Sequence, residues 1–169
     1  MSPHTTSSPQ LLTAASPERR HWIELPAHRS HVAVARRLMD ARMSAWRLPP
    51  ETSADAVLLV SELVTNAVCH TLSVRILCGI GLITDDCLRV EVHDHGRAAG
   101  GLPRCEPGPE DEGGRGLLLV QEIAHTWGVD RSPLTGGNAV WATLMVSDRE
   151  RGTCVDEDMP GAAAPRRAS

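Results

Sequence analysis

Residues 57–69 read Val57-Leu58-Leu59-Val60-Ser61-Glu62-Leu63-Val64-Thr65-Asn66-Ala67-Val68-Cys69, and this apolar stretch decides the fold class. Its apolar residues recur at helical spacing, and Thr52 or Ser53 can cap the start, so the pattern predicts a helix that ends at about Cys69. The predicted core face is one stripe, made of Val57, Val60, Val64, Ala67 and Val68. Glu62 and Asn66 form an i, i+4 polar pair on the opposite side, where they lie among leucines.

The rest of the chain predicts shorter elements on both sides of this helix. They are a strand at 22–25, a helix at 30–46, strands at 74–82 and 88–94, a loop at 95–113, a helix at 117–125, and strands near 127–130 and 139–146. This order predicts an α/β fold, a two-layer sandwich of a mixed β-sheet with helices on one face and the other face more open. Composition predicts disordered tails at 1–20 and 148–169, on either side of one domain at 21–147.

Composition excludes several classes of site and partner. All 17 basic residues are arginines, and without lysine the chain can form neither a lysine-containing phosphate loop nor a Schiff-base anchor. The net charge of −4 provides no basic field for nucleic acid or an anionic membrane. The five cysteines include no C-x-x-C pair, which indicates neither a disulfide framework nor a zinc ribbon. With no signal-peptide pattern and no apolar run long enough for a bilayer, we expect a cytoplasmic protein.

The first two motifs that could carry chemistry are the Glu62 and Asn66 pair and Asp94. The pair alone is also typical of a solvated helix edge. Asp94 shares strand parity with apolar residues, so it points toward the covered face, where a carboxylate needs a partner or water. Alone, it also fits an ordinary turn before Gly96. His93 and His95 alternate faces around it and cannot easily converge on a metal, so surface histidines are the favoured interpretation.

The third motif is the glycine-rich start of the third helix, at residues 113–117. Glycines there let backbone N–H groups approach an anion at the positive end of the helix dipole. A flexible loop that ends at a helix explains the same residues. The motif is not a dinucleotide fingerprint, because a long loop rather than a strand precedes it.

Together the three motifs resemble the N box and the two glycine boxes of the GHKL ATP-binding superfamily, which includes domains of gyrase, heat-shock chaperones, histidine kinases and mismatch-repair proteins. Residues 61–67 and 114–120, with a short lid, are most similar to its anti-sigma-factor serine/threonine kinase branch. Leu25-Pro26 and Trp127-Gly128 extend the resemblance to nearly all of residues 22–146. It implies the Bergerat-type ATP-binding fold.

The resemblance implies a role for each motif residue, with ATP and Mg²⁺ as cofactors. Asn66 would coordinate Mg²⁺, and Glu62 would be the general base for the attacking hydroxyl. Asp94 would accept a hydrogen bond from the adenine amino group, and Gly96 would leave room for the base. Residues 97–113 would form a mobile lid. The phosphates would be wrapped by the start of the third helix: Gly114, Arg115, Gly116 and Leu117.

The implied activity is phosphorylation of a serine or threonine on an anti-sigma-factor antagonist, which controls a sigma factor by partner switching. Neither nucleic acid nor a membrane is an expected partner, and a homodimer is compatible with the resemblance. One departure from the family concerns the last strand. In the family this strand usually begins Gly-Thr-x-Val, and the threonine supports the adenine-binding Asp. In this chain Ala139 stands in place of that threonine. Water would then substitute, or ATP would bind more weakly. This keeps open a non-catalytic module that binds a sigma factor or another partner, with a plain ATPase as a third hypothesis.

Overall fold

The structure is a computed structural model that describes residues 12–96 and 115–146. Five strands form one sheet in this part of the chain: β1 (Arg20–Pro26), β2 (Arg75–Thr84), β3 (Cys87–Asp94), β4 (Thr126–Arg131) and β5 (Asn138–Met145). The predicted lid at 97–113 and the predicted tail at 148–169 lie outside the described residues.

The sheet has the spatial order β1-β2-β3-β5-β4, and every neighbouring pair is antiparallel. The predicted two-layer α/β fold is confirmed, but the prediction of a mixed sheet was wrong. β3 and β4 run in the same direction, as a helical crossover between two strands favours. However, β5 lies between them and pairs antiparallel with both, so no two parallel strands are neighbours.

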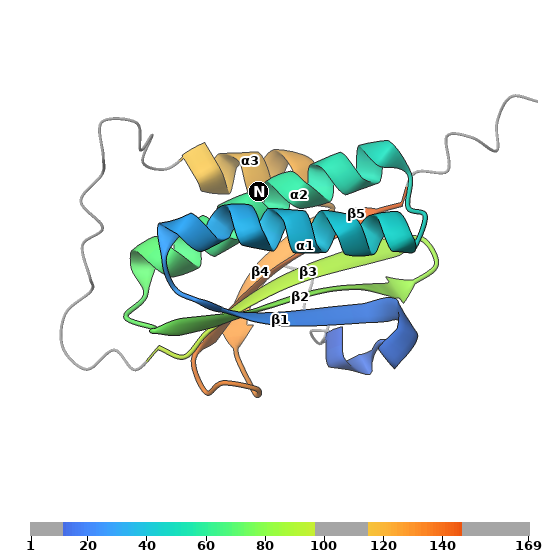
Figure 1. Cartoon of the computed structure of the whole chain (residues 1–169). Helices are drawn as coiled ribbons and strands as arrows, with labels where there is room; N and C mark the ends of the chain where they lie inside the picture. The colour runs from blue at the N-terminus through green and yellow to red at the C-terminus, as the bar shows by residue number, and fades with distance from the viewer. Residues whose placement is uncertain (1–11, 97–114, 147–169) are drawn as a thin grey trace, which may run out of the picture.

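Helices cover one face of this sheet (Figure 1). They are α1 (Val32–Ala45), α2 (Pro50–His70) and α3 (Arg115–Ile123), with single 3-10 turns at η1 (Leu12–Ala14), η2 (Pro17–Arg19) and η3 (Arg29–His31). The aliphatic core lies between the helices and the sheet, and its largest fully buried side chains include Met39, Met43, Leu59, Leu63, Ile76, Ile80 and Leu88. Leu, Ile, Val and Met therefore fill a core that contains no phenylalanine or tyrosine.

The helix α2 is central to the helical layer, since it contacts α1, α3 and three strands. It begins at Pro50, before the predicted caps, because proline suits the first turn of a helix. The predicted core face was correct in part, because Val60, Val64 and Ala67 are buried. The buried stripe also includes Leu59 and Leu63, and it leaves Val57 and Val68 only partly buried. By length and composition alone α2 could cross a bilayer, but half of that stretch is buried inside this domain, as in a core helix.

The other face of the sheet is covered in part by the chain that precedes β1, at the lower right of Figure 1. Leu12 is fully buried there, and Cβ atoms added at Gly79 and Gly81 would lie 2.8 and 2.5 Å from its methyl groups. The chain over 12–20 is thus folded, contrary to the prediction of a disordered tail over 1–20, while residues 1–11 lie outside the described part. Burial of Leu12 in the space left by two glycines, and the hydrogen bond from its backbone N–H to Glu91, help to dock a segment whose composition favours disorder.

Candidate nucleotide site

Several elements converge at one end of the sheet, on the left of Figure 1. β3 ends there at Asp94, which pairs with Ile76 near the start of β2. β2 follows α2 after four residues, so the end of α2 reaches the same region. β5 starts there at Asn138, and α3 begins at this end in Figure 1. The fold therefore brings the three sequence motifs to one end of the molecule.

Asp94 points toward the helix-covered face, as its parity with Val90 and Val92 predicts, and it is 5% exposed. Its Oδ1 accepts hydrogen bonds from the backbone N–H groups of Gly96, at 2.8 Å, and Asn138, at 3.0 Å. No described residue donates to Oδ2. Two donors on one oxygen fix the carboxylate plane and leave the second oxygen available to a ligand donor.

The structure explains why glycine stands at position 96, for a reason that the sequence prediction did not include. A Cβ at this position would lie 2.7 Å from Asp94 Oδ1, so a side chain would disturb the turn that holds the carboxylate. This constraint is compatible with the predicted role of leaving room for a base. Both requirements favour glycine after Asp94-His95.

The loop between β4 and β5 contributes residues that the sequence reasoning missed. Thr135 Oγ1 donates to the backbone oxygen of Asp94 at 2.5 Å. A Cβ at Gly137 would lie 2.3 Å from that oxygen and 2.4 Å from Oδ1, so only glycine fits there. The available signal was the Gly136-Gly137 pair before the last strand, which indicates a turn but not its contact with Asp94.

Ala139 does not face the carboxylate of Asp94. It pairs with His93 and shares the sheet face of that residue, while the Asp94 side chain points to the opposite face. The contacts that hold Asp94 come instead from the Asn138 backbone and the Thr135 hydroxyl. The missing hydroxyl at 139 therefore removes no contact to this carboxylate.

Glu62 and Asn66 lie on the C-terminal half of α2, one turn apart, and both are half-buried. They flank the buried stripe, next to Leu59 and Leu63, rather than standing opposite it. Half-burial gives their polar atoms access to a ligand while the backbone is held by the core. Their catalytic and metal-binding roles stay predictions.

The glycine-rich motif is described only in part. Gly114 lies outside the described residues, and Arg115, Gly116 and Leu117 form the first residues of α3. Their backbone N–H groups thus belong to the first turn of a helix, where such groups lack helical partners and favour an anion. The predicted phosphate contacts stay a prediction.

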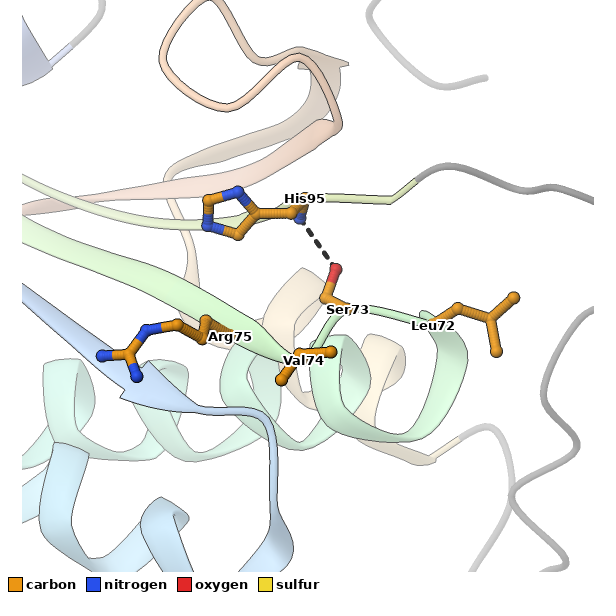
Figure 2. Close-up of a pocket in the computed structure, with 5 residues that line it drawn as sticks. All are labelled: Leu72, Ser73, Val74, Arg75 and His95. Carbon is orange, nitrogen blue, oxygen red and sulfur yellow. Dashed lines mark hydrogen bonds between the residues drawn. The ribbon is translucent and has the colours of Figure 1, made fainter.

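A shallow pocket of about 380 Å³ opens beside the end of β3 (Figure 2). Its lining residues are Leu72, Ser73, Val74, Arg75 and His95. Ser73 Oγ accepts from the backbone N–H of His95 at 2.7 Å, which joins the α2–β2 link to the chain after Asp94. Leu72 and Val74 are 49% and 83% exposed, so this rim is partly apolar. The sequence reasoning did not identify this pocket.

A second polar cluster lies on the opposite face of β3. Glu91 accepts from Arg89 Nε at 2.6 Å and from the backbone N–H of Leu12 at 2.8 Å, and its Oε2 is 2.8 Å from His93 Nε2. His93 is fully buried and meets Trp22 edge-on, so its interpretation as a surface histidine was wrong. Arg89 also stacks on Trp141, with 4.2 Å from Cζ to the ring centroid.

Electrostatics within this cluster favour an ionised Glu91. Burial by itself raises the pKa of Glu91, but the hydrogen bonds from His93 and Leu12 and the charge of Arg89 outweigh it and hold the pKa below its ordinary value. By contrast, Cys78 lies on the neighbouring strand β2, and burial raises the pKa of its thiol to about 12. The cluster is thus a buried network in which Glu91 is paired with Arg89 and His93.

Comparisons with known proteins agree with this geometry. Residues 25–144 match the family described as the histidine kinase-like ATPase domain. The chain is also similar to a crystal structure of the RsbU and RsbW domains of Rv1364c from Mycobacterium tuberculosis, with a TM-score of 0.55 and 21% identity. That match covers 74% of this chain but 31% of the other, and at this identity it supports the fold alone. Comparison with curated proteins finds no match. The family match spans most of the chain and includes Glu62, Asn66 and Asp94, so the chain belongs to the histidine kinase-like ATPase domain family.

Proposed function

We propose that this protein is a cytoplasmic ATP-dependent serine/threonine kinase that phosphorylates an anti-sigma-factor antagonist and so controls a sigma factor by partner switching. The observation that carries the proposal is Asp94, held by two backbone donors on Oδ1 in a domain of the histidine kinase-like ATPase family. Further support comes from the position of this carboxylate at the end of the sheet that α2 approaches with Glu62 and Asn66.

Asp94 recognises the base. Its free oxygen accepts from the adenine amino group, whereas guanine presents an oxygen at the same place and would leave the carboxylate unpaired. ATP therefore binds in clear preference to GTP. Competition in which GTP displaces ATP at equal concentration would contradict this role.

Asn66 fits the requirements of a Mg²⁺ ligand. Its amide oxygen is a hard donor, and the described residues contain no group of three His, Cys, Asp or Glu side chains that could hold a metal. In the proposed site, phosphate oxygens and water would supply the other ligands of the ion. When bound, Mg²⁺ would neutralise phosphate charge. Asn66→Ala should lose most of the Mg²⁺-dependent affinity for ATP in calorimetry and keep its fold by circular dichroism.

Glu62 acts as the general base. Its carboxylate takes the proton of the attacking serine or threonine hydroxyl, while the hydroxyl oxygen forms a bond to the γ-phosphorus. The bond between the γ-phosphorus and the β–γ bridging oxygen breaks, and ADP leaves with that electron pair. The phosphoryl group passes directly from ATP to the hydroxyl, so this step forms no phosphoryl-enzyme intermediate.

Phosphate transfer tests the proposal directly. The full chain is incubated with γ-labelled Mg-ATP and native cell lysate, and labelled proteins are mapped by mass spectrometry. We expect one dominant protein with a phosphorylated serine or threonine. ATP binding without any transfer would refute the kinase and favour the non-catalytic module, and transfer of phosphate only to water would favour a plain ATPase.

A further inference from the structure

The loop that joins β4 to β5, orange in Figure 1, lies against the end of β3. Three residues of this loop and its end contact or closely approach Asp94. The Thr135 hydroxyl donates to the backbone oxygen of Asp94, and the Asn138 N–H donates to Oδ1. Gly137 lies so close to these two oxygens that a Cβ would not fit there. A displacement of the loop would therefore weaken the hydrogen bonds that hold Asp94. The position of Asp94 depends on the position of this loop.

Ser132 holds the loop in turn. Its buried hydroxyl accepts from the backbone N–H groups of Leu134, at 3.2 Å, and Thr135, at 3.0 Å. Its backbone closes the same turn, because its N–H donates to Gly137 O at 2.8 Å and its carbonyl accepts from Gly136 N at 3.0 Å. One serine thus organises residues 132–137.

His93, whose side chain lies on the sheet face opposite to that of Asp94, orients the Ser132 hydroxyl. The carboxylate of Glu91 can only accept, so His93 Nε2, at 2.8 Å from it, carries a proton. In the neutral ring Nδ1 is then an acceptor for the Ser132 hydroxyl, at 2.8 Å. This arrangement leaves both lone pairs of Ser132 Oγ for the two backbone N–H groups. The hydrogen bonds of all three residues are mutually consistent.

We propose that Ser132 and Thr135 are positioning residues that set the adenine preference of the site by holding residues 132–138 against Asp94. The inference rests on the proposed function, in which Asp94 accepts from adenine. With Asn138 N–H held in place, the carboxylate keeps the orientation that leaves Oδ2 for the amino group. Without it, the carboxylate rotates and adenine loses its advantage.

The test compares the affinities of Mg-ATP and Mg-purine riboside triphosphate, which lacks the 6-amino group, by calorimetry. For the wild type we expect ATP to bind about tenfold or more tightly, since the analogue leaves Asp94 without its partner. Ser132→Ala and Thr135→Val should reduce this ratio at least threefold, roughly, by weakening ATP while sparing the analogue. Thr143→Val is the matched control, because it removes a hydroxyl bonded to Thr126 at the other end of the same hairpin.

Each outcome has one meaning. An unchanged ratio in both variants, or equal weakening of both nucleotides, overturns the positioning role, because a merely structural effect does not depend on the amino group. A wild-type ratio near one instead refutes Asp94 as the adenine acceptor, and with it the proposed function. If Ser132→Ala fails to fold, Thr135→Val decides, because Thr135 is only half-buried.

Discussion

The two faces of β3 are almost equally buried but differ in chemistry. One face carries Leu88, Val90, Val92 and, at its end, Asp94; the other carries Arg89, Glu91 and His93, and none of the seven is more than 5% exposed. Helices cover the first face, and the second is covered by Leu12 and aromatic rings from other strands. Alternation along a strand predicts which residues share a face, but not whether that face meets water. In the proposed function, Asp94 on the helix-side face binds the nucleotide, and residues on the other face help to position it.

The largest expected effect lies on the helix side. Glu62→Gln should slow phosphate transfer by about 10²–10⁴-fold, because the amide cannot accept the hydroxyl proton, while Mg-ATP affinity stays unchanged. Labelled-phosphate assays on the substrate identified in the lysate experiment measure the rate. Asp55→Asn is the control, since it neutralises an exposed carboxylate on the same helix. An unimpaired Glu62→Gln would sink the general-base role.

On the other face, Glu91→Ala should lower the free energy of unfolding by about 3–5 kcal/mol, because Arg89 stays buried without its partner. Val90→Ala, on the helix side of the same strand, should cost less, about 1–3 kcal/mol for the lost burial. Urea denaturation measures both. Equal losses would mean that the charge network contributes no more than packing does.

The segment before β1 provides the next test. Leu12→Ala should lower the free energy of unfolding by about 2–3 kcal/mol, because the side chain is fully buried against Gly79 and Gly81. Leu38→Ala, on the 42% exposed side of α1, is the matched control and should cost well under half as much. Similar losses in urea denaturation would contradict docking of this segment onto the sheet.

The stability that Glu91 provides should depend on pH. Because the pKa of Glu91 is lower in the folded state than its ordinary 4.5, its ionised form stabilises the fold above that pH. This stabilisation is lost as the pH falls through the folded pKa. The stability difference between the wild type and Glu91→Gln should therefore shrink below pH 4.5 in urea titrations. A constant difference would contradict the paired, ionised state.

The smallest effect concerns Cys78 on β2. With its pKa near 12 and its side chain buried in the core, this thiol should resist alkylation by iodoacetamide at about pH 8 until the protein unfolds. Cys87, which is only half-buried, should react before Cys78. Mass spectrometry of labelled peptides separates the two, and rapid labelling of Cys78 in the folded protein would contradict its burial.

Much of the fold could be read from local patterns. The period of apolar residues predicted α2 and the β2–β3 hairpin, and parity placed Asp94 on the helix-covered face. These inferences succeed because side-chain direction follows directly from 3.6-residue and two-residue periods. The core face of α2 was predicted only in part, however, because a helix that is apolar nearly all round has no distinct stripe.

Local sequence patterns were thus enough to predict most of the helices and strands, to single out the three motifs of the predicted ATP site, and to place Asp94 on the correct side of β3. The assembled fold was needed to show that β5 separates β3 from β4, that Leu12 covers part of the outer face, and that Thr135 and Gly137 approach Asp94 from a loop held by Ser132. Local preferences act over a few residues, and they predict each element separately. Contacts between residues 40 to 80 positions apart depend on how the whole sheet assembles, because they form only when strand order brings those segments together.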